Sequence, residues 1–365
     1  MSGEKVRISP NQITVIIITL IISTVDIFLP NFVAREAKKD SWLSVIIAVA
    51  AVLPVVLIHL MLYRKYREST LIEICKKTGG KVFGIFFGLS YVLYFLLISW
   101  TVTGEMSIVM NSAFLPLTPS WFFLTVSVLV SAYAVSRGIE AIARLSEILL
   151  PVGIFAFLFL FAENVKNVDF KNFLPVLSEG ITPPVRGGLI IAGVLFEIIV
   201  IMQILPFASD QKRVGRPVYI GLLISGACIF AGTIIYGFFG QLTEAFLLPA
   251  LEFARYAPID SNIQSLDIFI IAIWITGIYI KIMVFYYTAV FSLAQLFSIE
   301  DYKRLVIPVG LFIYSMCTVS CEKVTAGMNF IHYIFPVYSM TMGFLIPGLM
   351  LIISYFSKKS AKAAA

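Results

Sequence analysis

Apolar residues fall into ten stretches along this chain, and each stretch is long enough to cross a bilayer as a helix. A helix needs about 20 predominantly apolar residues to span the hydrocarbon core. The predicted spans are residues 13–33, 41–62, 82–114, 120–136, 140–162, 187–208, 217–240, 267–297, 304–322 and 332–356. The pattern therefore predicts an all-α integral membrane protein with ten transmembrane helices.

Polar and small residues interrupt the first and sixth spans near their middle. Residues 23–26 include an acid and are followed by Pro30, while Gly193 and Glu197 precede Pro206. A charge at the bilayer centre costs about 2.5–3.5 kcal/mol on insertion scales, so an acid there is a candidate functional residue. Irregular backbone persists at membrane depth only where protein or a water-filled cavity satisfies it. The two breaks therefore predict a cavity between spans one and six.

The composition agrees with a lipid environment. Hydrophobic residues make up 59% of the chain, charged residues 13%, and the mean hydropathy is +0.96. This excludes a soluble domain of 365 residues, because the polar surface that such a domain needs is missing.

The distribution of lysine and arginine predicts the orientation. With the N-terminus inside, most of these 27 residues fall on the cytoplasmic side, so the positive-inside rule places both termini in the cytoplasm. The net charge of +6 then faces anionic membrane lipid, the expected partner. No nucleic-acid partner is expected, because no soluble basic domain is present.

Motifs of enzymes and metal proteins are absent from the sequence. It contains no glycine-rich phosphate loop, no His-Glu-x-x-His and no paired nucleophile and base. Cys317 and Cys321 share one helix face, but they are better explained as small buried hydrophobes than as metal ligands. We expect no catalytic residues, no metal and no cofactor.

The order of the spans predicts an internal repeat. Five spans precede the loop at 163–186 and five follow it, so a second half built like the first would lie inverted in the membrane. We expect a single membrane domain over 1–365, with one repeat at about 9–162 and the other at about 187–356.

Corresponding features of the two halves support this pairing. Both broken spans close with Leu-Pro, spans three and eight are the longest, and the amphipathic segments 69–77 and 249–256 follow spans two and seven. Inverted repeats of this kind bind their ligand at the midplane between the repeats.

The half-helix N-termini in such a site direct positive dipole ends towards an anion such as a carboxylate. Spans three and eight each offer one helical face to the same cavity. The predicted binding residues are Ser23, Thr24, Val25 and Asp26 in span one, Tyr94, Ile98 and Thr101 in span three, Gly193, Val194, Phe196 and Glu197 in span six, and Val284 and Thr288 in span eight.

Lys281 is a basic residue in the middle of span eight. A lone buried ammonium would neutralise, so a carboxylate partner is expected, and Glu105, Glu197 and Asp26 are the candidates. The pair could simply hold helices together, or the ammonium could occupy the place of a coupling cation and make the protein independent of sodium.

Short stretches spread along nearly the whole chain resemble one known family. They are ISPNQ (8–12), EA (36–37), DSWLSV (40–45), TLIE (70–73), AYAVSRGIE (132–140), ARLSEI (143–148), NFLPVL (172–177), EG (179–180), EII (197–199), LPF (205–207) and IKI (280–282). They are similar to the B subunit of nutrient germinant receptors, the spore germination protein family within the amino acid-polyamine-organocation transporter superfamily.

The resemblance implies a LeuT-like fold of ten spans with a 5+5 inverted repeat, in which helices one and six are broken. It further implies residence in the spore inner membrane, assembly with a larger A-type subunit and a lipoprotein C-type subunit, and sensing of a small nutrient such as an amino acid, sugar or nucleoside.

The chain departs from the family at the breaks. Ser23 and Val25 stand where relatives favour glycine, Phe196 stands where they have a small residue, and Asp26 replaces a hydrophobe. These changes suggest a smaller or differently charged pocket. Two hypotheses remain open: a germinant-binding subunit that signals through partners, and a stand-alone amino-acid/proton symporter in which Asp26 or Glu197 carries the proton.

Overall fold

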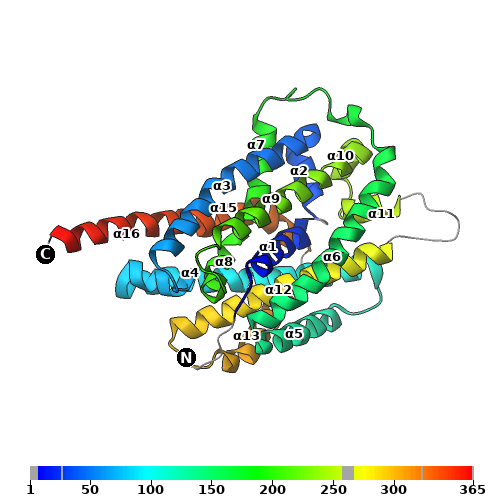
Figure 1. Ribbon diagram of the computed structural model, residues 1–365. Coiled ribbons are helices and arrows are strands. Elements are labelled where there is room, and N and C mark those ends of the chain that lie inside the picture. Colours follow the sequence, from blue (N-terminus) through cyan, green and yellow to red (C-terminus); the bar gives the residue numbers. More distant parts are fainter. Residues whose placement is uncertain (1–6, 26–27, 257–266, 322–323, 364–365) are drawn as a thin grey trace.

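The chain folds into a bundle of helices, shown here by a computed structural model that describes residues 7–25, 28–256, 267–321 and 324–363 (Figure 1). The helices are α1 (Pro10–Val25), α2 (Leu29–Ala37), α3 (Ser41–Lys65), α4 (Leu71–Val109), α5 (Ser120–Arg137), α6 (Ile139–Asn164), α7 (Thr182–Leu195), α8 (Ile201–Ile204), α9 (Gly215–Gly232), α10 (Ile234–Phe239), α11 (Pro249–Arg255), α12 (Asp267–Leu296), α13 (Val306–Cys321), α14 (Val324–Asn329), α15 (Phe335–Met340) and α16 (Ile346–Ala363).

The helices reproduce the predicted spans. Within the described residues, nine helical segments are long and apolar enough to cross a membrane, and Pro10–Ser23 is a shorter apolar helix. One of the nine, Leu29–Lys65, joins α2 and α3, so α1 followed by α2 forms the first pass. The all-helical fold with ten passes is confirmed.

Both expected breaks are present. α1 ends at Val25 and α2 starts at Leu29, with Pro30 in its first turn, where a missing N–H leaves no extra group unpaired. α7 gives way to a 3₁₀ turn, η5 (Phe196–Val200), then to the short α8 and a second 3₁₀ turn, η6 (Leu205–Phe207). The second half of the sixth pass therefore alternates between 3₁₀ turns and a short α-helix and is not one continuous α-helix.

Spans six and eight form the centre of the bundle. In the most apolar window of Thr182–Phe207, 94% of residues are buried, and in that of Trp274–Leu296 83%, against 17% for Ile139–Asn167. α12 packs along α4 and also contacts α1, α5 and α6. The sixth pass from Ile190 onwards, which includes η5, and α12 from Trp274 onwards are therefore largely shielded from lipid, whereas α6 lies at the periphery.

The first turn of α4 is formed by a capping box. Thr70 Oγ1 accepts from the Glu73 amide at 3.3 Å, and the Glu73 carboxylate accepts from the Thr70 amide at 3.1 Å. The amphipathic segment expected at 69–77 is a helix of its own that meets span three at a kink, because the backbone of Gly80 is not helical and its φ of 64° suits glycine.

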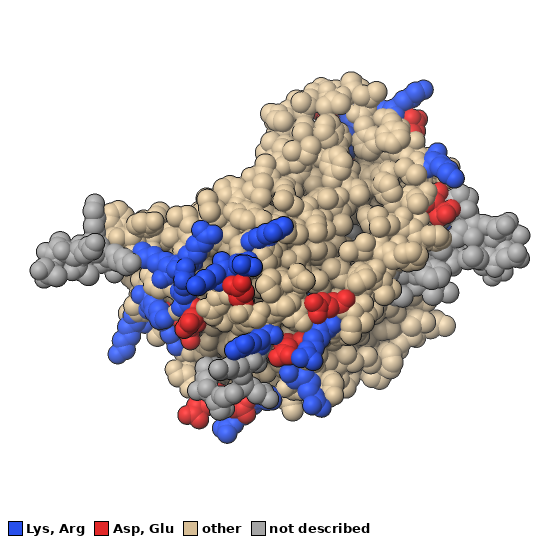
Figure 2. Space-filling view, in the orientation of Figure 1, with Lys and Arg blue, Asp and Glu red and all other residues tan. Residues whose placement is uncertain are grey.

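Basic side chains gather at one end of the molecule. Figure 2 shows Lys and Arg clustered on the side of the bundle where the chain termini lie, with a broad uncharged surface beyond them. Large apolar side chains such as Val82, Phe155 and Ile307 are exposed, as expected of a lipid-facing surface. The assignment of this end to the cytoplasm stays a prediction.

Candidate binding site at the broken helices

The centre of the site is an ion pair between α12 and the sixth-span break. Lys281 Nζ lies 2.7 Å from Glu197 Oε2, and the two side chains are 0% and 3% exposed. Glu197 lies in η5, so the 3₁₀ turn sets the position of the carboxylate beside α12. Of the three acids considered for Lys281, Glu197 is therefore in direct contact with it. Removing either partner of such a pair leaves an uncompensated charge and costs about 3–5 kcal/mol.

A third charged residue, Glu105, adjoins the pair. It lies on α4, is 5% exposed, and is close enough to interact electrostatically with both Lys281 and Glu197. Two carboxyl groups and one ammonium thus lie in the same buried region. Such a set can exchange a proton or admit a ligand ammonium, because opposite charge is already in place.

A short hydrogen-bonded chain connects span three to the sixth-span break. The hydroxyl of Tyr94 lies 2.7 Å from Ser339 Oγ, which donates to the Gly193 carbonyl at 2.6 Å. Gly193 belongs to the last turn of α7, where carbonyls lose their intrahelical partners. Tyr94 also interacts electrostatically with Glu197. Tyr94 therefore holds the break in position through α15.

Glycine allows α15 to approach α7 closely. A Cβ on Gly193 would come within 2.7 Å of Pro336 Cα, which is closer than real Cβ atoms approach a backbone. Close contact through small residues is typical of helices packed in membranes. The absence of a side chain at Gly193 therefore lets the last turn of α7 pack directly against the start of α15.

Phe196 packs on the last pass. It is buried, and a Cβ on Gly343 would come within 2.8 Å of Phe196 Cβ. Gly343 lies in the π turn η10 (Thr341–Leu345) between α15 and α16. The smaller pocket expected from Phe196 stays a prediction.

The first-span break is described only in part. Ser23 is buried, its hydroxyl donates to the Leu20 carbonyl at 3.1 Å, and its Cβ is 3.2 Å from where a Cβ on Gly277 of α12 would lie. The backbones of Thr24 and Val25 complete α1, but their side chains, and all of Asp26, lie outside the described residues.

The remaining predicted residues line a packed interior. Ile98, Val194 and Val284 are buried apolar side chains. The Thr101 hydroxyl donates to the Leu97 carbonyl at 2.8 Å. Thr288 likewise donates to its own helix, at 2.9 Å to the Val284 carbonyl. In this conformation both hydroxyls already donate to backbone, so either can bind a ligand only as an acceptor unless that bond is broken.

A small cavity reaches the region from the α6 side. Its volume is about 60 Å³, and it is lined by Ser23 of α1, Gly153 and Phe157 of α6, and Trp274 and Gly277 of α12, among others. It therefore adjoins the first-span break, while Tyr94, Phe196 and Glu197 lie in tightly packed surroundings.

Two glutamines that the sequence analysis did not single out close the end of the site nearer the termini. Gln203 Nε2 donates to Gln295 Oε1 at 2.7 Å, and Thr70 Oγ1 donates to the same oxygen at 2.9 Å. The Lys76 ammonium donates to the Gln295 carbonyl at 2.7 Å. The sixth pass, α12 and the start of α4 are thereby joined below the ion pair. An amide in an apolar run was the only sequence signal for this junction.

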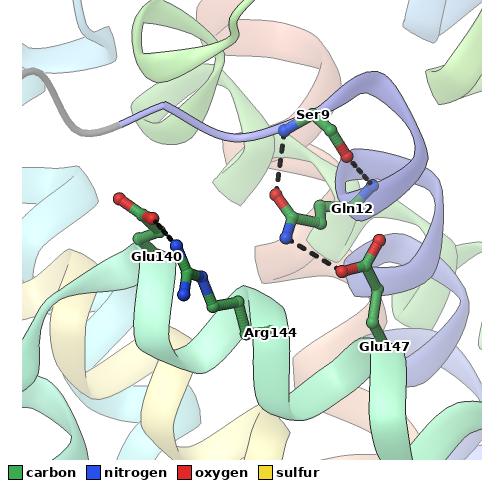
Figure 3. A network of polar contacts seen from close by, with 5 residues as sticks. All are labelled: Ser9, Gln12, Glu140, Arg144 and Glu147. Carbon is green, nitrogen blue, oxygen red and sulfur yellow. Dashed lines mark hydrogen bonds and ion pairs between the residues drawn. The ribbon is translucent and has the colours of Figure 1, made fainter.

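The first described residues form a second junction at the same end (Figure 3). Gln12 Nε2 donates to Glu147 Oε2 of α6 at 2.9 Å, and Ser9 and Gln12 exchange backbone-to-side-chain bonds of 2.8 and 3.2 Å. Glu140 and Arg144 form a separate ion pair one turn away on α6. The charged start of α6 is therefore linked to α1 through Glu147.

Comparisons with known proteins identify the family and the fold. A family model described as "Spore germination protein" matches residues 7–325. Spore germination protein YndE of Bacillus subtilis is 24% identical, with 99% of this chain and 100% of the relative covered. Spore germination protein KB of the same organism is 25% identical, with 98% and 96% covered.

Solved transporters share the fold. The crystal structure of MhsT in complex with L-phenylalanine superposes with a TM-score of 0.70 at 15% identity, covering 97% of this chain and 100% of that one. Mhp1, a nucleobase-cation-symport-1 family transporter, gives 0.65 at 14% identity, covering 95% and 78%. At these identities the likeness shows the fold alone. The matched family model nevertheless extends over most of the sequence, and the chain belongs to the spore germination protein family.

Proposed function

We propose that this chain is the germinant-sensing membrane subunit of a spore nutrient receptor, and that it binds a small nutrient, an amino acid in particular, between spans one, three, six and eight. The observation that carries the proposal is the buried Lys281–Glu197 pair at the sixth-span break. Membership of the spore germination family supports the germination role, and the transporter fold supports a midplane ligand site.

The ion pair suits a ligand that carries both charges. An amino-acid carboxylate can accept from Lys281, and its ammonium can take the place of that lysine beside Glu197 or Glu105. The exchange replaces one buried pair by two and so keeps each charge compensated. It also separates α12 from η5, which changes the packing of the breaks.

Signalling requires two conformations that bind the nutrient with different affinity. The described conformation holds Gln203, Gln295 and Thr70 together at one end of the site. A nutrient that favours the separated form shifts the population towards it, and in this proposal A-type and C-type partner subunits in the spore inner membrane detect that shift. No enzymatic step is needed.

The alternative function is a stand-alone amino-acid/proton symporter. The buried carboxyl groups of Glu197 and Glu105 favour it, because a proton carrier must be shielded from lipid and close to a countercharge. In this alternative Glu197 or Asp26 carries the proton.

Binding and counterflow uptake of a labelled amino-acid panel by purified protein in liposomes, with and without a proton gradient, tests both. Wild type is compared with Glu197→Gln and with Glu140→Gln, a matched change in an exposed ion pair. Saturable binding without uptake, lost only in Glu197→Gln, supports the receptor. Gradient-driven uptake supports the symporter, and binding that survives Glu197→Gln contradicts a site at the break. Co-purification with A-type and C-type subunits provides an independent test of the partners.

A further inference from the structure

A second cavity, here called the outer apolar cavity, lies at the end of the bundle opposite the termini. Its volume is about 110 Å³, and it lies between α2, α6, the α9–α10 junction and α12. Residues that define it are Leu29 and Pro30 of α2, Phe157 and Phe161 of α6, Ile235 of α10 and Trp274 of α12. It is separate from the Lys281–Glu197 pair, neither of whose residues lines it.

Three hydroxyl groups in the wall of the cavity already donate their hydrogen bonds to backbone carbonyls. The hydroxyls of Ser41, Thr233 and Thr243 donate to the carbonyls of Lys38, Phe230 and Gly240, respectively. A zwitterion placed here would lose hydration for few compensating hydrogen bonds, which is unfavourable. The wall therefore selects hydrocarbon.

The cavity borders the lipid-facing surface of α6. Phe155 and Leu158 on the same stretch of α6 are 71% and 57% exposed, and Phe230, at the end of α9, is also exposed. Between them, Phe157 and Phe161 are half-buried and line the cavity. Lipid chains that cover this face of α6 thus lie next to the residues that line the cavity.

The far side of the cavity approaches polar loops. Tyr236 lines the cavity and interacts electrostatically with Glu244, Asp40 and Glu179, which belong to the connections at this end of the bundle. An amphiphile can therefore bury its chain while its head group stays at the polar layer, as a bilayer lipid requires.

We propose that the outer apolar cavity binds one acyl chain of a membrane lipid from the leaflet opposite the termini. The chain passes between α6 and α10, ends near Trp274, and contacts Leu29 and Pro30 immediately after the first-span break. Ile191, two residues before Gly193 on α7, also lines the cavity. The lipid thereby braces the outer halves of both broken spans, and it stabilises the conformation in which the cavity exists.

The cavity's position also links it to the midplane. Phe157 and Trp274 line both this cavity and the smaller one at Ser23. The two side chains therefore separate a hydrocarbon-binding space from the first-span break, and a shift of α12 changes both volumes together.

A phospholipid with a diazirine near the end of one acyl chain, incorporated in nanodiscs with the full chain, tests the proposal. After photolysis, mass spectrometry locates the adducts. Adducts on Ile235 and Trp274, each 5% exposed, are expected in addition to those on Phe155 and Leu158. Adducts confined to Phe155 and Leu158 in wild type would overturn the proposal without any variant.

The matched variants are Gly232→Phe and Gly348→Phe. A Cβ at either glycine meets no heavy atom within 4 Å, but only Gly232 lines the cavity. Gly232→Phe should remove the adducts on Ile235 and Trp274 while sparing those on Phe155 and Leu158, which also report that the variant is folded. Gly348→Phe should change neither set.

Equal labelling of Ile235 and Trp274 in both variants contradicts the assigned chain position. A diazirine-bearing alkyl alcohol provides the second arm. If the alcohol labels the interior residues and the phospholipid does not, the cavity takes a free apolar solute and the lipid assignment is wrong.

Discussion

Lys281 and Glu197 lie 2.7 Å apart although they belong to passes separated by more than 80 residues and neither side chain reaches solvent. The contact joins a straight central helix to a tightened 3₁₀ turn, the least regular part of the sixth pass. Each charge is stabilised by the other, because both side chains are buried away from solvent.

Single replacement of either partner should destabilise the protein more than joint replacement. Lys281→Met or Glu197→Gln alone should lower the free energy of unfolding by about 3–5 kcal/mol, because each leaves one buried charge. The double variant should recover much of that loss. Denaturation in mixed micelles provides the measurement, analysed as a double-mutant cycle. Strict additivity would argue against direct coupling, and the exposed pair Lys38–Glu179 is the control, with little change expected.

Nutrient binding by wild type should not depend on sodium, because the Lys281 ammonium already supplies a cation at the break. Lys281→Ala removes that cation and leaves the Glu197 carboxylate beside an open volume, so a dependence on sodium or on low pH should appear. Binding isotherms in sodium and in choline buffer measure this. Sodium dependence in wild type that persists unchanged in Lys281→Ala would eliminate the role assigned to the lysine.

Ser339→Ala should weaken nutrient binding. The change removes the donor to the Gly193 carbonyl and the acceptor for Tyr94, and an unpaired buried polar group costs about 1–3 kcal/mol. The affinity should fall by roughly tenfold if half of that cost appears in binding, since about 1.4 kcal/mol corresponds to tenfold. Ser315→Ala, at an exposed serine that bonds its own helix, should leave affinity unchanged. If Ser339→Ala and Ser315→Ala change the affinity equally, Ser339 contributes only to the stability of the fold and not to nutrient binding.

Gln295→Leu should open the end of the site nearer the termini. Gln203 and Thr70 both donate to the Gln295 side-chain oxygen, and the leucine leaves them without it. Cys75, buried at the start of α4, should then react faster with a membrane-permeant maleimide. Peptide mapping gives the rate. Gln241→Leu, an exposed glutamine at the opposite end, is the control, and an unchanged Cys75 rate would show that the junction does not hold α4.

The architecture could be predicted largely from sequence because lipid imposes strict rules on it. Span lengths follow from the thickness of the bilayer, and the breaks follow from charged or helix-breaking residues in apolar runs, as at Glu197 and Pro30. Membrane helices tolerate such residues only where the protein itself satisfies them.

Contacts between residues of distant passes were harder to predict from the sequence. Glu105, Glu197 and Asp26 were all possible partners of Lys281 by sequence, and the structure places Glu197 against it. The roles of Ser339 and Gln295 could not be predicted, because helical spacing tells which face of its helix a residue lies on but not which other helix packs against that face. The amphipathic segment before span three, by contrast, could be predicted as a separate helix, because Gly80 has a non-helical backbone that interrupts the helix between the two.

The pairing of Ile8 with the end of the sixth pass has a practical consequence for anyone attaching a label. The Ile8 amide donates to the Phe207 carbonyl, and the Ser209 amide donates to the Ile8 carbonyl, each at 2.8 Å. Together the two bonds form an isolated parallel β-bridge between Ile8 and Ala208, directly after η6. A bulky fusion at the amino end would therefore disturb the end of the broken sixth span, to which Ile8 is hydrogen-bonded. A reporter attached beyond α16 would not, because α16 packs on α3 and α4 and its far end projects from the bundle (Figure 1).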